Sequence, residues 1–334
     1  MSANNKSHSA RNTLIAFLAF GVVVFLAIKF VDFTAVVDTF LGMDFEASPE
    51  LSDIIEKDNF TKKATRILKA SKPELLNAGD FNSKCYSDLE KENSVLGCYT
   101  NNTIFVYDID NAELNGIKET VLAHELLHAI WSRMSINERR DLYDDLEIIY
   151  RQEEKELSDH MSGYSEDEYY DELHSVIGTQ VADEKLTAAL RDHYAEYFES
   201  QAKIVGFYDA YNGKFKALEN RARELEAEIE QRRTQIDNLT ASYEAESRDL
   251  LANIESFNAR AESGGFSDMA SFYSERNALV SRQSQLNSNY EALNALIDET
   301  NALITEYNSN VVEVGKLYDS VNSRVQKPSA ELND

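Results

Sequence analysis

Apolar residues in the C-terminal third of the chain repeat at alternating steps of three and four residues. Such a repeat places the apolar side chains on one stripe of a helix and is typical of a coiled coil. Ser263-Gly264-Gly265 separates two stripes, which predicts a turn between them. The first stripe contains Leu218, Ala222, Leu225, Ile229, Ile236, Leu239 and Tyr243, and the second contains Leu286, Tyr290, Leu293, Ile297, Thr300, Ile304, Tyr307, Val311, Val314, Tyr318, Val321 and Val325.

We expect the two stripes to form an antiparallel coiled-coil hairpin over residues 207–325, followed by a C-terminal tail at 326–334. Each arm of about 50 residues would be about 75 Å long at 1.5 Å per residue. The alternative is a single helix that pairs in parallel with a partner chain. The hairpin could bind a substrate or a protein partner, cover a cleft as a lid, or serve only as a spacer or oligomerisation element, and the sequence does not choose among these roles.

Residues 12–31 form an almost entirely apolar segment in which Lys29 is the only charged residue. About 20 helical residues suffice to cross a bilayer, so we expect a transmembrane signal anchor here. Lys6 and Arg11 precede the segment, and acidic residues dominate after it. The positive-inside rule therefore predicts a cytoplasmic tail at 1–11 and a single-pass protein whose bulk lies outside the cytoplasm, in the cell envelope. A cleaved signal peptide is the alternative, although no clear small-x-small cleavage site follows.

The 334-residue chain has a net charge of −26. Residues 1–31 hold three basic residues and no acidic one, so the remainder carries −29. A body this acidic repels nucleic-acid phosphates and anionic lipid headgroups, and we therefore expect no nucleic-acid partner. The chain contains only 3 prolines and 12 glycines, which predicts a mainly helical protein.

Between the anchor and the hairpin, the local patterns predict short elements of both kinds. We expect a juxtamembrane linker at 32–50 and a helix within 51–70, where apolar residues recur at a helical period. The β-rich runs 95–99 and 103–109 flank Thr100-Asn101-Asn102-Thr103, which predicts a hairpin turn. Further on, Ser135 and Glu138 have capping-box spacing before the next helix, and Gly178 suggests a break in a later one.

Cys85 and Cys98 are the only two cysteines, and they lie 13 residues apart. Outside the cytosol, an even pair at short spacing predicts a disulfide bond, which would stabilise the fold by about 3 kcal/mol. Two unpaired thiols are the alternative. Zinc binding by this pair alone is not expected, because no further cysteine exists to complete such a site.

The segment His124-Glu125-Leu126-Leu127-His128 contains two histidines four positions apart. On a helix they share a face and can present their imidazole nitrogens to one metal ion. Glu125 would lie beside the open coordination position, where a carboxylate can accept a proton from water bound to Zn²⁺. The surrounding residues are uncharged, as a buried active-site helix requires. We therefore expect a zinc site with Glu125 as general base, and the alternative is a solvated helix with incidental histidines.

The run Val121–Ile130 resembles the extended active-site signature of the zincin metallopeptidases. The resemblance covers residues 85–200 and does not include the hairpin. It implies a helix packed under a small sheet whose edge strand holds the substrate backbone, and the run Thr103–Ile109 is in the right place to be that strand. The chain departs from the metzincin pattern, because no glycine and third histidine follow His128 at the expected steps.

Zinc needs a third protein ligand, and Asp171-Glu172-x-x-Ser175 resembles the thermolysin-type (gluzincin) third-ligand motif. The departures are Asp for Asn and a gap of 44 residues after His128. The resemblance implies Glu172 as the ligand, with His174 as the alternative. Two positions apart correspond to about 200° around a helix, so only one of these side chains can face the metal.

Together these features predict a mainly α protein with a small β-hairpin (α+β): a zincin-like metallopeptidase domain at 51–206, followed by the coiled-coil hairpin. The leading hypothesis is a membrane-anchored, outward-facing zinc peptidase that hydrolyses peptides or proteins. The alternative is a non-catalytic envelope scaffold with a zinc-stabilised head, and an amidase of cell-wall peptides differs only in substrate. Glu125 favours an enzyme, since a structural zinc site has four closed ligands. The candidate oxyanion donors, among which the sequence does not choose, are Tyr164, Tyr169, Tyr170, His193 and Tyr194.

Overall fold

The computed structural model describes residues 33–86, 95–161, 164 and 166–324. The chain divides into two compact units, which we call the head (Met1–Gly213 with Asp319–Asp334) and the arm (Lys214–Tyr318). The expected cytoplasmic tail, the expected anchor at 12–31 and the C-terminal tail lie outside the described residues. Within the described ranges, no helix is both long and apolar enough to cross a membrane.

Among the described residues of the head, three strands form a sheet in the order β1-β3-β2. β1 (Glu74–Leu76) pairs in parallel with β3 (Thr103–Tyr107), and β2 (Gly97–Thr100) pairs antiparallel with β3. Asn101 and Asn102 connect β2 to β3 with φ angles of 51° and 60°. Positive φ at both central residues is what a type I′ hairpin turn requires, so the predicted hairpin is confirmed.

The central position of β3 overturns one expectation. The run Thr103–Ile109 was expected to supply the edge strand, but β3 is paired on both sides. The three-residue β1, which the sequence did not predict, covers its second side. Among the described strands, β2 therefore forms the edge of the sheet on the side opposite β1.

The segment 32–50, which we expected to be a linker, contains helix α2 (Phe33–Leu41). Asp38 on α2 is buried and accepts a hydrogen bond of 2.9 Å from Nε of Arg133. Just beyond the helix, a Cβ on Gly42 would lie 2.8 Å from Cβ of Lys69, so the backbone there approaches α4 (Lys62–Ala70) closely. α2 is thus packed onto the head and is not an extended connection.

The helical period over 51–70 is divided between two helices, α3 (Pro49–Asp58) and α4. Asn59 ends α3 in the left-handed conformation, with φ 53° and ψ 54°. Thr61 then begins α4 by accepting a hydrogen bond from the amide of Ala64. Local capping therefore ends the first helix where the apolar period alone predicts continuation.

Helix α7 (Ile117–Arg133) is the central helix of the head, and it packs on both β2 and β3. The other side of α7 packs against α10 (Glu166–Gln180). The capping box predicted from Ser135 and Glu138 is present at the start of α8. The other helices among the described residues of the head are α5 (Ala78–Lys84), η1 (Ala112–Leu114), α8 (Ile136–Gln152), α9 (Glu154–Met161), η2 (Asp183–Lys185) and α11 (Ala188–Ala195).

Gly178 does not interrupt its helix, because α10 continues to Gln180. A Cβ at this position would lie 2.5 Å from Cδ1 of Leu127 and 2.7 Å from Cε1 of Tyr194. The glycine therefore permits the close approach of α10 to α7, and the expected break at this residue is wrong.

Cys85 and Cys98 form the predicted disulfide bond. Both cysteines are buried, and their bond joins the C-terminal end of α5 to β2. The edge strand of the sheet is therefore held covalently as well as by its ladder with β3.

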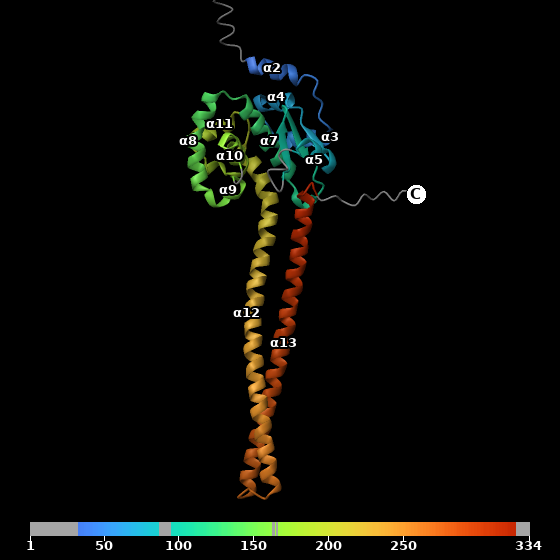
Figure 1. The fold of residues 1–334 in the computed structure, drawn as a ribbon, viewed down its shortest axis with the longest axis vertical. Helices are drawn as coiled ribbons and strands as arrows, with labels where there is room; N and C mark the ends of the chain where they lie inside the picture. Colours follow the sequence, from blue (N-terminus) through green and yellow to red (C-terminus); the bar gives the residue numbers. More distant parts are fainter. Residues whose placement is uncertain (1–32, 87–94, 162–163, 165, 325–334) are drawn as a thin grey trace, which may run out of the picture. The chain divides into compact units, whose positions relative to one another are not determined.

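The arm is formed by the greater part of α12 (Gln201–Glu262) and of α13 (Met269–Val321), which run antiparallel within one chain (Figure 1). Interhelical ion pairs show this direction, since Arg221 pairs with Glu306, Arg232 with Glu299 and Arg282 with Glu246. At the tip, the ring centroids of Phe257, Phe266 and Phe272 lie 5.2–5.3 Å apart.

The apolar stripe of α13 is shifted in part from the predicted positions. Tyr290, Val311 and Tyr318 are about half exposed, whereas Asn310 and Leu317 are buried near the base of the arm. Leu286, Leu293 and Thr300 are buried as the stripe predicts. The spacing therefore predicts the pairing of two helices but not every side chain between them.

Both ends of the arm continue into segments that belong to the head. At the start of α12, Nε2 of Gln201 donates hydrogen bonds to the carbonyl oxygens of Gly178 (3.1 Å) and Val181 (2.8 Å). After the arm, Ser323 and Asn82 exchange two hydrogen bonds. The head thus includes residues from both sides of the arm, which differs from the expected boundaries at 206 and 325.

Candidate metal site

Helix α7 presents His124, Glu125 and His128 toward a cleft of the head. Its flanking residues are uncharged and buried, as the sequence predicts, so the helix is fixed by apolar packing on several sides. The fully buried side chains nearest to the histidines are Leu122, Ala123, Leu126, Leu127, Ala129 and Ile130. The positions of the two histidines are therefore determined by a helix that has little freedom to move.

Helix α10 brings Glu172 to the two histidines of α7. Nε2 of His128 lies 3.1 Å from Nε2 of His124 and 3.4 Å from Oε2 of Glu172, and Nε2 of His124 lies 3.5 Å from Oε1 of Glu172. Tetrahedral ligands that bind zinc at 2.0–2.1 Å lie about 3.3 Å from one another. The three side chains thus form a cluster that could hold a metal ion, and two imidazoles with one carboxylate are a donor set that suits zinc.

Asp171, the residue before Glu172, accepts a hydrogen bond of 2.8 Å from Nδ1 of His128. This contact leaves Nε2 of His128 directed at the cluster, which is the arrangement found around metal-binding histidines. Burial lowers the pKa of His128, but Asp171, Glu172 and Glu125 outweigh it, and the net pKa is well above its ordinary value. The carboxylates around His128 therefore favour a positive charge at this position.

The same balance governs Glu172, which is buried. Burial raises its pKa, but His124 and His128 act in the opposite direction and more strongly, so the net pKa is lowered. Glu172 is therefore ionised in the folded protein, as a metal ligand must be.

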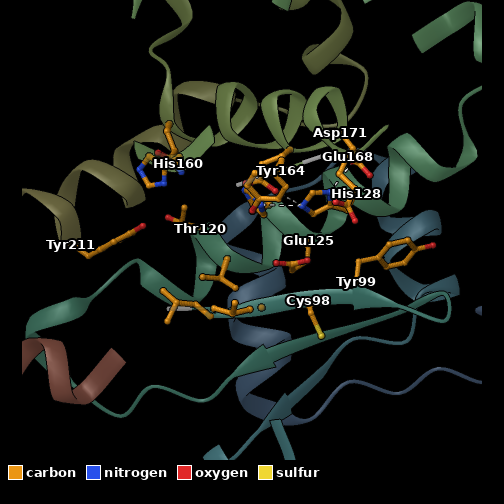
Figure 2. A pocket seen from close by; sticks show the side chains of 17 residues that line it. Cys98, Tyr99, Thr120, Glu125, His128, His160, Tyr164, Glu168, Asp171 and Tyr211 are labelled. Atoms are coloured by element: carbon orange, nitrogen blue, oxygen red, sulfur yellow. Dashed lines mark hydrogen bonds and ion pairs between the residues drawn. The ribbon is translucent and has the colours of Figure 1, made fainter. Parts of the chain in front are cut away.

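The cluster opens into a cleft with a volume of about 340 Å³. β2 forms one wall through Gly97, Cys98 and Tyr99, and α7 and α10 form others. Figure 2 shows Glu125 between α7 and the strand that carries Cys98. Glu125 is only 5% exposed. A cleft of this size lies within the range of small-ligand and peptide side-chain sites.

His174, the alternative third ligand, does not lie with the cluster. Its Nε2 is 2.9 Å from Nε2 of His193, and its ring packs against Trp131 with a centroid distance of 5.0 Å. Burial lowers the pKa of His174 well below its ordinary value and lowers that of His193 to about 4. The two imidazoles are therefore neutral, and they contact each other rather than the cluster.

The five candidate oxyanion donors are separated by the structure. Tyr164 lines the cleft, whereas Tyr169 and Tyr170 pack against Tyr150 and Tyr143. His193 contacts His174, and the hydroxyl of Tyr194 donates a hydrogen bond to the carbonyl oxygen of His174. His193 and Tyr194 therefore form contacts away from the cleft. Of the five, only Tyr164 is among the residues that line the cleft.

Several lining residues were not predicted to belong to the site. His160, Tyr211 and Gly97 lie in segments without a recognisable motif, and they join the site only through the fold. Asp171 was noted for its spacing to Glu172, and its bond to His128 could have been anticipated from the need of a metal-binding histidine for a second partner.

Comparisons of the chain with protein-family models, with curated proteins and with solved structures find no match. The properties of the site are therefore argued from its own geometry.

Proposed function

We propose that the protein is a zinc-dependent peptidase of the zincin type, anchored in a membrane by residues 12–31 with residues 32–334 outside the cytoplasm. The observation that carries this proposal is the triangle of His124, His128 and Glu172, which lines the same cleft as the buried Glu125. The resemblance of residues 121–130 and 171–175 to zincin sequences supports the same activity.

In this proposal His124, His128 and Glu172 hold the zinc ion, and Asp171 orients His128. Bound zinc would polarise the substrate carbonyl and lower the pKa of a water molecule. Glu125 accepts the proton of the attacking water and then delivers it to the amine that leaves. Tyr164 is the candidate donor to the developing oxyanion, because it lines the cleft.

The substrate backbone would extend along β2. Among the described strands it is at the edge of the sheet, and it lines the cleft at Gly97, Cys98 and Tyr99, so the backbone of its outer side could form a ladder with an extended peptide. β2 takes the role that the sequence had suggested for Thr103–Ile109.

The test uses the full-length chain purified in detergent, and it combines zinc content with cleavage of a peptide library. We expect one zinc ion per chain and measurable cleavage. Glu125→Gln should retain zinc and lower kcat by about 10² to 10⁴, since it removes only the base. Glu113→Gln is the matched control, because Glu113 is an exposed carboxylate outside the cleft. A wild-type chain that binds no zinc, or a Glu125→Gln variant with full turnover, contradicts the proposal.

The length of the arm favours one alternative, a non-catalytic scaffold in which a zinc-stabilised head carries an interaction arm. α12 and α13 contain 62 and 53 residues, far more than the cleft requires. The same experiment separates the two functions. Bound zinc without cleavage of any peptide in the library supports the scaffold.

A further inference from the structure

We propose that Gly97 is a positioning residue for Glu125: the absence of a side chain at residue 97 creates the space that the Glu125 carboxylate occupies. The inference rests on the proposed function, since it assigns the strand residue that sets the location of the general base. Gly97 lies on β2 and Glu125 on α7, so the contact joins the edge strand to the candidate catalytic helix.

The space at Gly97 is filled by its neighbours on α7. A Cβ added to Gly97 would lie 2.6 Å from Oε1 and 2.7 Å from Cγ of Glu125. It would also lie 2.7 Å from Cγ1 of Val121, one helical turn earlier on α7. All three distances are below 3.0 Å, a separation that real Cβ atoms essentially never show. Residue 97 can therefore carry no side chain while Glu125 keeps its position.

Backbone conformation does not explain the glycine. Gly97 is paired with Val106 in the regular antiparallel register of β2 and β3. Of the described glycines, Gly116 and Gly264 have positive φ, and Gly97 does not. A glycine inside a strand lowers stability and commonly marks a close approach of another group. Here the group that approaches is the side chain of Glu125.

Neither the backbone of β2 nor that of α7 can move away from this contact without breaking other interactions. β2 is held by its ladder with β3 and, at the next residue, by the Cys85–Cys98 disulfide. α7 is held on its opposite side by α10, where Gly178 allows an equally close approach. A methyl group at residue 97 should therefore displace the Glu125 side chain rather than separate the strand from the helix.

The metal ligands should be unaffected by this displacement. His124 and His128 are not among the nearest neighbours of the added Cβ, and Glu172 is on α10. The proposal thus predicts that Gly97→Ala separates two properties: zinc binding is retained, and proton transfer by Glu125 is impaired. A role of Gly97 in general folding would reduce both properties together.

The kinetic test is a double-mutant cycle with Glu125→Gln in the full-length chain. We expect Gly97→Ala to lower kcat by about 10²-fold with little change in KM, and to have no further effect on kcat in the Glu125→Gln background, because the base is then already absent. Zinc affinity, measured by competition with a chelator, should change less than about threefold. Equal losses from Gly97→Ala in both backgrounds would overturn the proposal.

Gly206→Ala is the matched control, because no atom lies within 4 Å of a Cβ at that helical position. It should leave kcat and zinc affinity unchanged. Val121→Ala in the Gly97→Ala background removes one of the three close contacts and should restore part of the lost kcat. If Gly97→Ala and the double variant with Val121→Ala both lose zinc or the disulfide, residue 97 is needed for the fold, and the positioning role is refuted.

A crystal structure of Gly97→Ala tests the steric claim without reference to turnover. We expect the Glu125 carboxylate to move while the backbones of β2 and α7 stay in place. A shifted β2 with an unmoved Glu125 would refute the inference. This result is independent of the proposed peptidase activity. A wild-type chain that cleaves no peptide would contradict the activity, whereas the positioning of Glu125 would still be decided by the Gly97→Ala crystal structure.

Discussion

The head and the arm differ in where they place their charges. In the head, several carboxylates are almost completely buried, among them Asp38, Asp58, Glu119, Glu125 and Glu172. In the arm, the interhelical ion pairs lie at the surface, where both partners remain substantially exposed to solvent. A buried carboxylate needs a specific partner or a raised pKa, whereas an exposed ion pair is screened by water.

The difference teaches which substitutions each region tolerates. Removing one partner of a buried pair leaves an uncompensated charge and costs several kcal/mol, whereas an exposed pair contributes about 0–1 kcal/mol. Trp131 is the only tryptophan and is buried in the head, so its fluorescence follows unfolding of the head. Far-UV circular dichroism also detects the arm.

The largest effect should come from the metal ligands. Glu172→Ala removes one of three ligands and should lower zinc affinity by more than about 100-fold, which exceeds the usual loss from outer partners. His174→Ala is the control on the same helix and should change zinc affinity little, because His174 faces His193 instead. Competition with a chelator measures both. If His174→Ala empties the site and Glu172→Ala does not, the ligand assignment is wrong.

The second effect concerns a buried pair of the head. Arg133→Ala should lower the free energy of unfolding by about 3 kcal/mol, because it leaves the buried Asp38 carboxylate without its partner. Urea denaturation followed by Trp131 fluorescence measures this loss. Adding Asp38→Asn to Arg133→Ala removes the unpaired buried charge of Asp38 and should recover part of the lost free energy of unfolding. A loss below 1 kcal/mol would show that the head tolerates charge removal as the arm does.

Asp58 should give a smaller effect that depends on pH. Burial and the neighbouring Glu119 raise its pKa well above the ordinary value, against the opposing influence of Lys203 and Lys57. Because the folded-state pKa is raised, the stabilisation is complete below the unfolded pKa of about 3.9 and is lost as the pH rises through the folded-state pKa. Neither carboxylate oxygen of Asp58 has a hydrogen-bond partner among the residues that the structure describes.

We therefore expect Asp58→Asn to be increasingly more stable than wild type as the pH rises above 4, by up to about 1.4 kcal/mol per pH unit until the folded-state pKa is passed. Urea denaturation at several pH values between 4 and 8 tests this expectation. Glu56→Gln, an exposed position on the same helix, is the control and should follow the wild type. A constant difference between Asp58→Asn and wild type at all pH values would contradict it.

The smallest effect is expected in the arm. Arg232 pairs with Glu228 and Glu299 at the exposed surface, so Arg232→Ala should lower the free energy of unfolding only slightly, and less again at high salt. Circular dichroism during urea denaturation measures it. A loss near that of Arg133→Ala would remove the contrast between the two regions.

Features fixed by local spacing could be predicted from the sequence. His124 and His128 share a face because of the helical repeat, and Asn101-Asn102 form the turn because they tolerate positive φ. The same holds for the capping box at Ser135 and for the pairing of the two long helices. In each case the physical cause acts within a few residues along the chain.

The remaining features depend on partners that are distant in sequence. β1 has only three residues, and its pairing with β3 made the predicted edge strand a central one. α2 is stabilised by Arg133, which lies 95 residues away. Gly97 gave no local signal and Gly178 gave a misleading one, since each glycine matters only through the helix that packs on it. Which residues of α13 are buried likewise depends on how α12 packs against it.

The attachment of both ends of the arm to the head has a consequence for covalent connectivity. The arm is an excursion that leaves the head after Gly213 and returns at Asp319, where Gln201 on one side and Ser323 on the other are tied to it. A single protease cut at Gly264 would therefore release no part of the head. The fragment before the cut remains attached to the head near Gln201, and the fragment after it remains attached near Ser323. Equal numbers of heptads could be added to or removed from α12 and α13 without moving either attachment point. The length of the arm can therefore change while the sequence of the head stays constant.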